Sequence, residues 1–134
     1  MLLTITTHGR KRILANDSGH ALLVRWWQSA DAWLVGRYVI LPDHLHAFVA
    51  PRRTDVSLPR WVRFWKAGVS REWAERDDRP LWQRDFWDTQ LRAHQSYDAA
   101  WEYVCRNPVR AGLVGERTEW PYQGTLNVLP WNER

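Results

Sequence analysis

The chain has 134 residues, of which 45% are hydrophobic and 25% carry a formal charge. This composition excludes a disordered chain, and no apolar run approaches the roughly 20 residues that a membrane-spanning helix needs. We therefore expect a single domain over residues 1–134, which is long enough to bury a hydrophobic core.

The charged residues are mostly arginines. The formal net charge is +4, and Lys11 and Lys66 are the only lysines among 19 basic residues. Guanidinium groups suit phosphate binding and base stacking, and the 11 tryptophans supply many flat faces. In a basic protein, however, tryptophan more often lies in the core and arginine on a solvated surface. Composition alone leaves the partner open.

Cysteine usage and the N-terminal sequence indicate the compartment. Cys105 is the only cysteine, so the chain has neither a disulfide framework nor a thiolate zinc cluster. A short apolar stretch at the N-terminus precedes Arg10, Lys11 and Arg12, which is the reverse of the order in a signal peptide. We expect a cytoplasmic protein that does not associate with membranes.

The first half of the chain predicts three strands and one helix. Residues 2–7 are rich in β-branched side chains and predict the first strand. A helix is expected over about residues 19–30, after a run of N-cap candidates, with its apolar residues on one side. Residues 33–41 are apolar on both faces, as in a central strand, and a Pro-Asp turn joins them to a strand over residues 44–50.

The second half predicts two helices and one strand. Ser57 caps a helix that runs to about residue 76 and has a wide apolar face. Residues 81–92 predict a fourth strand with its approach. A last helix is expected over residues 96–106, and it ends at Asn107 because the following Pro108 disfavours helical geometry before it. From there on we expect mostly loop.

The order of these elements is β-α-β-β-α-β-α. With antiparallel neighbours, this order predicts an α+β fold, a ferredoxin-like sandwich. Its sheet would carry helices on one face, with an added C-terminal helix that bears Tyr103. Such a fold does not by itself give a function.

Two histidines separated by one residue open the strand over residues 44–50. Successive side chains of a strand alternate between faces, so His44 and His46 emerge side by side, with Leu45 on the other face. This spacing predicts a metal clamp. Since two imidazoles do not hold a divalent ion firmly, a third ligand is expected elsewhere in the chain.

The last helix carries a polar edge beside its apolar stripe. At about 100° per residue, Tyr103 and Asn107 lie within about 40° of each other and away from the stripe that includes Tyr97. A tyrosine placed only for packing would join the stripe, so the pair indicates a site. The alternative is a partly exposed tyrosine beside a helix-terminal asparagine. Tyr97 and Cys105 are expected to be core residues.

These residues carry a resemblance. His44, Leu45 and His46, with Tyr103 and Asn107, resemble the active-site pattern of the single-tyrosine HUH transposases. The closer match is to the subgroup associated with repetitive extragenic palindromes (REP). The supporting segments occur in the family's order and spacing; they are VILPDHLH at 39–46, LWQRDFWD at 81–88 and YVCRNPVRAGLV at 103–114.

The resemblance implies a metal-dependent single-stranded DNA endonuclease and strand transferase. His44, His46 and the side-chain oxygen of Asn107 would hold one Mg²⁺ or Mn²⁺ against the scissile phosphate. Tyr103 would attack phosphorus to give a 5′-phosphotyrosyl link and a free 3′-hydroxyl. The expected partner is single-stranded DNA, in particular palindromic hairpins, and the protein would act as a monomer or a homodimer.

Basic residues near and beyond this site are candidates for phosphate binding. Arg106 and Arg110 neighbour the catalytic positions in sequence. Further candidates are Arg52, Arg53, Lys66, Arg84 and Arg92.

Two other functions remain open. The first is a DNA-binding protein of transposase ancestry that no longer cuts, against which the intact His44, His46, Tyr103 and Asn107 argue. The second is a metal-dependent enzyme acting on small phosphate esters. The excess of arginine and the tryptophan content favour a polymeric substrate instead.

Overall fold

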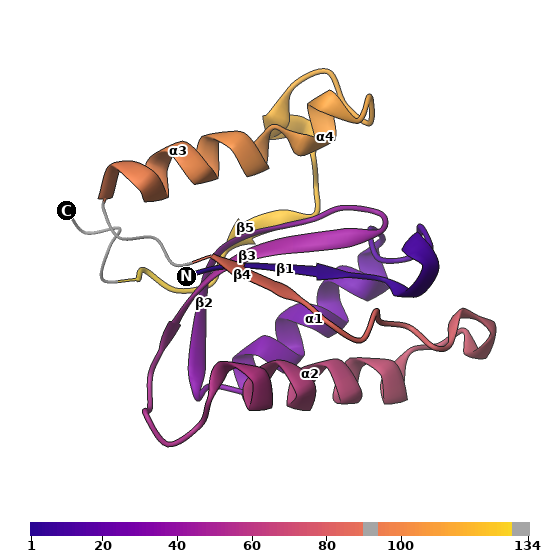
Figure 1. Ribbon diagram of the computed structural model, residues 1–134. Helices are drawn as coiled ribbons and strands as arrows, with labels where there is room; N and C mark the ends of the chain where they lie inside the picture. Colours follow the sequence, from indigo (N-terminus) through magenta and orange to yellow (C-terminus); the bar gives the residue numbers. More distant parts are fainter. Residues whose placement is uncertain (90–93, 130–134) are drawn as a thin grey trace.

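A computed structural model describes residues 1–89 and 94–129 (Figure 1). Five strands form one antiparallel sheet in the order β4-β1-β3-β2-β5. The strands are β1 (Leu2–Thr6), β2 (Trp33–Ile40), β3 (His44–Pro51), β4 (Trp87–Thr89) and β5 (Gln123–Thr125). The α-helices are α1 (Asp17–Ser29), α2 (Leu58–Glu72), α3 (His94–Cys105) and α4 (Asn107–Arg110). Short 3-10 turns are η1 (His8–Arg10), η2 (Arg76–Asp78) and η3 (Arg117–Glu119).

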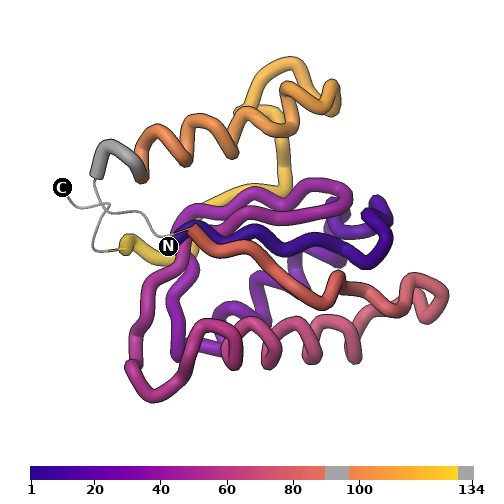
Figure 2. Tube along the Cα trace, viewed as in Figure 1, coloured from indigo at the N-terminus to yellow at the C-terminus, as the bar shows by residue number. Residues whose placement is uncertain are grey.

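Helices cover both faces of the sheet. α1 and α2 lie on one face, and α3 and α4 lie on the other, as Figures 1 and 2 show. The expected α+β fold is therefore confirmed, and the added C-terminal helix that carries Tyr103 lies on the opposite face from the first two helices. Each face has its own hydrophobic cluster.

The α1–α2 face holds the larger cluster. Asn16 caps α1 by accepting a hydrogen bond from the backbone N–H of Gly19 at 2.8 Å, and Ser57 caps α2 in the same way. Trp61 and Trp65 of α2 are almost fully buried, and the Trp61 indole donates to the Ala30 carbonyl at 2.6 Å. This indole bond ties the start of α2 to the end of α1.

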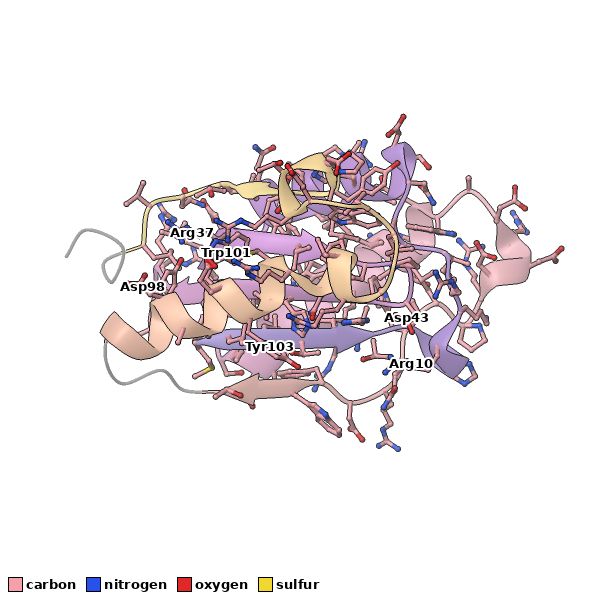
Figure 3. The ribbon with its side chains drawn as sticks, turned by 90° about the horizontal axis from the view of Figure 1, so that it is seen from above. Arg10, Arg37, Asp43, Asp98, Trp101 and Tyr103 are labelled. Atoms are coloured by element: carbon pink, nitrogen blue, oxygen red, sulfur yellow. The ribbon has the colours of Figure 1, made fainter. Side chains whose placement is uncertain are left out.

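The α3 face is held by aromatic contacts. Tyr97 of α3 is 1% exposed, and its ring centroid lies 4.4 Å from that of Phe48 on β3. The guanidinium of Arg37 lies over the Tyr97 ring at 5.7 Å and over the Trp101 ring at 5.5 Å (Figure 3). The interpretation of Tyr97 as a core residue is confirmed, and so is that of Cys105, which is 2% exposed.

The C-terminal half differs from the prediction in three places. β4 has only three residues, and positions 90–92 of the expected strand lie outside the described residues. α3 ends at Cys105, and a new helical turn, α4, begins at Asn107, because proline at the start of a helix needs no N–H partner. β5 was expected to be loop, since its three residues include a glycine and carry no strand pattern.

No helix in the described part of the chain combines the length and the apolar character that a membrane crossing requires.

Candidate active site

β3 presents both histidines to the α3 face. Leu45 and Ala47 belong to the core under α1 and α2, whereas Phe48 belongs to the core under α3. Because alternate residues of a strand share a face, His44 and His46 project toward α3. Their ring centroids are 5.0 Å apart. The predicted side-by-side placement of the two imidazoles is therefore confirmed.

A neighbouring side chain fixes each imidazole through its Nδ1 atom. Nδ1 of His44 lies 2.7 Å from the Asp43 carboxylate, which also accepts from Arg10 Nε at 2.9 Å (Figure 3 labels Asp43 and Arg10). Nδ1 of His46 lies 2.9 Å from Oγ1 of Thr4, its register partner on β1. Within the described residues neither Nε2 atom has a hydrogen bond, so both are available as ligands.

Local electrostatics keep His46 neutral. Burial, together with the smaller electrostatic effects of His44 and Arg110, lowers the pKa of His46 to about 4. Burial alone would raise the pKa of Asp43, but its hydrogen bond to His44 and the nearby charges of His44 and Arg10 hold that pKa below the ordinary value. At neutral pH the site therefore has a neutral imidazole at His46 and an ionised carboxylate behind His44.

Tyr103, Asn107 and Arg110 form a second group at the junction of α3 and α4. The Tyr103 side chain is 65% exposed, on α3 above the sheet (Figure 3). The guanidinium carbon of Arg110 lies 4.0 Å from the centre of the Tyr103 ring, and Nη2 donates to the Tyr103 carbonyl and to Oδ1 of Asn107. The charge of Arg110 also acts on His46, so this group lies close enough to the histidine pair for the two to form one candidate site.

The segment after the junction anchors it to the sheet. Pro108 is buried, and its carbonyl accepts from the backbone N–H of Leu113. Arg117 of η3 forms a 2.6 Å ion pair with Glu102 of α3. The Trp120 indole donates to the Ile40 carbonyl of β2 at 2.9 Å. These contacts fix the part of α3 that carries Tyr103 over the strands.

The available donors limit what the site could hold. Across residues 1–89 and 94–129, no group of three or more His, Cys, Asp and Glu side chains is close enough to hold a metal ion. A divalent cation here would rest on the Nε2 atoms of His44 and His46 and on a ligand of another type. Asn107 offers a side-chain oxygen, Oδ1, which accepts a hydrogen bond from Arg110 in this structure. Two imidazoles whose Nε2 atoms have no hydrogen bond within the described residues fit such an ion.

The predicted phosphate-binding residues are spread over the molecule. Arg106 and Arg110 lie at the α3–α4 junction, where Arg106 pairs with Glu102 at 3.6 Å. Arg52 and Arg53 follow the other end of β3, roughly 20 Å along the strand from His46. They form ion pairs with Asp31 and Asp55, respectively.

Lys66 and Arg84 line a groove beside α2 on the opposite face of the sheet, and Arg92 lies outside the described residues. The Lys66 ammonium donates to the Gln83 carbonyl at 2.9 Å, and burial lowers its pKa despite the opposing effect of Asp85.

Sequence reasoning missed the residues behind the imidazoles. Asp43 stands in the turn directly before His44, so its position offered a signal, but no role was assigned to it. Thr4 lies 42 positions from His46, and only the register of β1 against β3 brings the two together.

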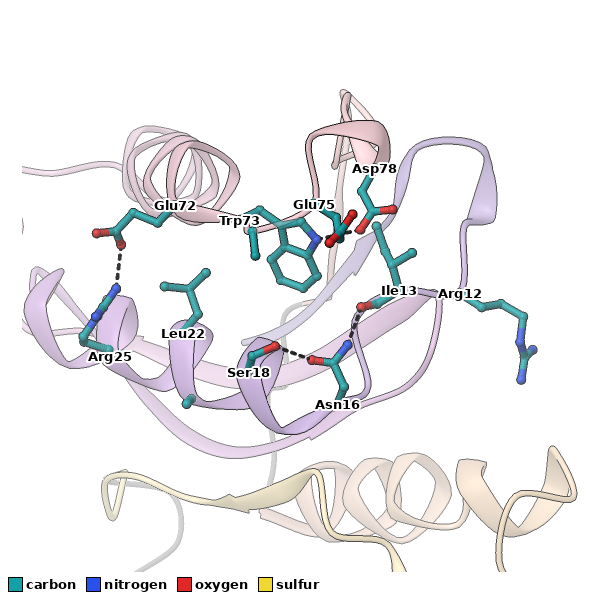
Figure 4. A pocket seen from close by; sticks show the side chains of 12 residues that line it. Arg12, Ile13, Asn16, Ser18, Leu22, Arg25, Glu72, Trp73, Glu75 and Asp78 are labelled. Carbon is teal, nitrogen blue, oxygen red and sulfur yellow. Dashed lines mark hydrogen bonds and ion pairs between the residues drawn. The ribbon is translucent and has the colours of Figure 1, made fainter.

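A separate cleft of about 630 Å³ lies between α1 and the end of α2 (Figure 4). Its polar lining is largely paired: Arg25 bonds Glu72 at 2.7 Å, and the Trp73 indole bonds Asp78 at 2.8 Å. The sheet separates this cleft from the histidine pair, and its contacts serve to fix the helix ends.

The chain has curated relatives in two bacteria. It is 28% identical over 89 residues to a REP-associated tyrosine transposase of Escherichia coli, covering 66% of this chain and 52% of that protein. It is 26% identical over 94 residues to a candidate REP-associated tyrosine transposase of Haemophilus influenzae, covering 62% and 53%. The chain thus spans about half the length of these curated relatives. No protein-family profile matches the chain.

Two solved structures share the fold. One is a REP-associated tyrosine transposase bound to a REP hairpin, with a TM-score of 0.76, 21% identity, and coverage of 91% of this chain and 73% of that one. The other is a candidate transposase from Deinococcus radiodurans, with a TM-score of 0.57, 16% identity, and coverage of 77% and 85%. In sequence and in fold, the chain is thus similar to the REP-associated tyrosine transposases.

Proposed function

We propose that the protein is a metal-dependent endonuclease and strand transferase that cleaves hairpin-associated single-stranded DNA through a 5′-phosphotyrosine on Tyr103. The observation that carries this proposal is the pair of imidazoles on the α3 face. Each is held through Nδ1, and in the described part of the chain each Nε2 has no hydrogen bond. Tyr103, Asn107 and Arg110 lie above the same face. The named relatives and the hairpin-bound structural neighbour support the same class of protein.

Each residue of the candidate site has its own part in the proposed reaction. His44 and His46, together with Asn107, would hold Mg²⁺ or Mn²⁺, which when bound supplies Lewis-acid stabilisation of the charge on the scissile phosphate. Asp43 and Thr4 keep the two imidazoles in place. Arg110 has the planar cation that suits a phosphate oxygen, and it can leave Asn107 for the DNA.

Tyr103 is the nucleophile in this scheme. Its phenol oxygen forms a bond to phosphorus while the bond from phosphorus to the 3′-oxygen breaks. The phenol loses its proton, and the leaving 3′-oxygen gains one, so the step is balanced. The phosphodiester is exchanged for a phosphotyrosine, and the strand end can later be rejoined by the reverse reaction.

The alternative is a DNA-binding protein that does not cut. The specific observation in its favour is the hydrogen bond from Arg110 to Oδ1 of Asn107, which occupies the proposed third ligand. In that case the protein would bind hairpin DNA with or without metal and form no adduct.

Tyrosine variants distinguish the two candidates. The protein is incubated with labelled DNA hairpins from repeats around its own gene, with Mn²⁺ or EDTA, and run on a denaturing gel. We expect a metal-dependent adduct in the wild type and in Tyr97→Phe, a buried tyrosine on the same helix, but none in Tyr103→Phe. An adduct that persists in Tyr103→Phe would overturn the assignment of the nucleophile.

A further inference from the structure

Trp87 lies in one row with the histidine site. Thr4 of β1 pairs with His46 on one side and with Trp87 of β4 on the other. Residues directly opposite each other in antiparallel strands share a face, so Trp87, Thr4 and His46 all project toward α3. The row crosses two strand spacings, which places the backbone of Trp87 roughly 10 Å from that of His46.

The indole of Trp87 is largely exposed. It is 64% exposed, and it is the one exposed tryptophan in the described part of the chain. Within residues 1–89 and 94–129, its ring makes no aromatic contact and its Nε1 donates no hydrogen bond. By contrast, the indoles of Trp61, Trp82 and Trp120 all donate to backbone carbonyls.

The residues on either side of Trp87 in the chain point the other way. Asp88 pairs with Leu3, a core residue under α1 and α2, and Phe86 packs against the same core. The carboxylate of Asp88 therefore lies on the opposite face from the indole. The indole of Trp87 is therefore the aromatic surface that β4 presents to the α3 face, at the open edge of the sheet.

The other side of this edge is basic. A groove of about 840 Å³ between α2 and the segment before β4 is lined by Arg63, Lys66 and Arg84, together with the acidic Asp85, and it reaches Trp87. A DNA strand that follows these cations over the edge of β4 arrives at Trp87 before it reaches His46. Successive bases of single-stranded DNA stack on exposed aromatic side chains along basic grooves.

We propose that Trp87 is a stacking platform for an unpaired base of single-stranded DNA next to the scissile phosphate. The position of that phosphate rests on the function proposed above, but the stacking contact does not require cleavage. A second protein copy that pairs along β4 would be the competing occupant. Because β4 has only three residues in the described part of the chain, it offers little backbone for such pairing.

The test measures DNA affinity without cleavage. A fluorescein-labelled hairpin with single-stranded flanks is titrated in EDTA with Tyr103→Phe protein, alone and combined with Trp87→Ala, Trp87→Phe or Phe64→Ala. Phe64 is a matched control, because it is 59% exposed but lies on α2. We expect Trp87→Ala to weaken binding roughly 5- to 150-fold, Trp87→Phe to restore most of it, and Phe64→Ala to have no effect.

Two further readouts sharpen the result. The dependence of affinity on salt should keep its slope in Trp87→Ala, since stacking releases no counterions. An abasic site at the contacted flank position should weaken binding of the Trp87-containing protein and abolish its advantage over Trp87→Ala.

Unchanged DNA affinity in Trp87→Ala would overturn the proposal. If Trp87→Ala changed only the sedimentation of the protein, the β4 edge would be assigned to self-association instead. Loss of affinity in Trp87→Ala alongside a wild type that forms no covalent adduct would support stacking and reject cleavage. The opposite combination would reject stacking and leave cleavage standing.

Discussion

At the scale of single residues, His46 has an environment that suits a ligand better than a charged group. Its strand lies between two others, and its Nδ1 is bonded to Thr4. Burial, with smaller effects of His44 and Arg110, lowers its pKa to about 4. The folded protein therefore resists protonation of this ring in a pH range where a solvated histidine becomes charged. Stability must follow pH accordingly.

The first prediction concerns this pH dependence. Between the ordinary pKa of 6.5 and about 4, the unfolded chain binds a proton at His46 and the folded protein does not, so stability falls as the pH decreases through this window. The shift corresponds to roughly 3 kcal/mol. Urea unfolding of the metal-free protein in EDTA, from about pH 7 to about pH 4, should show this loss.

His46→Gln is the matched variant for this measurement. It should flatten the pH dependence, and the part due to His20, whose pKa burial also lowers, should remain. An equally steep acid destabilisation in His46→Gln would contradict the assignment to His46.

Asp43 gives a second prediction at the residue scale. Asp43→Ala removes the carboxylate that holds Nδ1 of His44, so metal-dependent cleavage should fall about 10- to 100-fold while DNA binding in EDTA is retained. Asp31→Ala serves as the control, because the Asp31 side chain accepts from a surface arginine, Arg52, at 3.3 Å, away from the histidines. Cleavage by Asp43→Ala at the rate of Asp31→Ala would show that the contact has no catalytic importance.

The sequence predicted the part of the site that depends on local spacing. The alternation of a strand was enough to place His44 and His46 side by side, and helical periodicity separated Tyr103 from the buried Tyr97. The hydrogen bond between Thr4 and His46 could not be predicted, because a single sequence does not give the register between strands that are distant along the chain.

At the scale of elements, the position of Tyr103 depends on how α3 and α4 are held to the sheet. Tyr97 and Val104 are buried beneath α3, and Trp120 reaches back to the Ile40 carbonyl of β2. The Trp120 bond lies at the end of β2 beside the turn that leads to His44. It therefore couples the tyrosine helix to the strand pair that carries the histidines.

A third prediction tests this coupling. Trp120→Phe keeps an aromatic ring but removes the hydrogen bond to Ile40, which should cost about 1–3 kcal/mol of unfolding free energy. Trp33→Phe removes a similar bond, to the Val56 carbonyl at 2.8 Å, on the opposite face. Chemical denaturation should show comparable losses in both variants, whereas adduct formation should fall only in Trp120→Phe. Equal cleavage by the two variants would argue against the coupling.

The elements that sequence reasoning missed are those without a pattern of their own. β5 spans three residues, and it is a strand because its backbone pairs with β2. Its sequence has no hydrophobic alternation from which a strand could be predicted. Within residues 81–89 the predicted strand is limited to the last three, and its approach carries an isolated bridge between Thr7 and Trp82. The long helices and central strands were predictable because their apolar periodicity is sustained over several turns or alternations.

At the scale of the whole molecule, the two faces of the sheet carry different kinds of residues. The α1–α2 face carries most of the large buried aromatic residues, whereas the α3 face carries the histidines and the exposed Tyr103 and Trp87. Arg106 and Arg110 add positive charge to the α3 face. Stability and the proposed chemistry are thus built largely from different residues.

The fourth prediction follows from this charge distribution. Binding of single-stranded DNA should weaken as salt increases, with a slope of about −0.7 for each phosphate contacted. Replacing Arg106 and Arg110 by glutamine should flatten the slope by about 1.4, because two phosphate contacts are lost. Replacing Arg52 and Arg53, which pair with acids at the far end of β3, should leave the slope unchanged. The reverse pattern would move the DNA path to that end.

The polarity of the covalent adduct tests the central claim most directly. One hairpin is labelled at its 3′ end and another at its 5′ end, and each is incubated with wild-type protein in Mn²⁺ or in EDTA. We expect the 3′ label to become attached to the protein only in Mn²⁺, at the peptide that contains Tyr103. The 5′ label should be released on a shorter strand with a 3′-hydroxyl. Tight binding of both hairpins with no labelled protein under either condition would contradict the central claim.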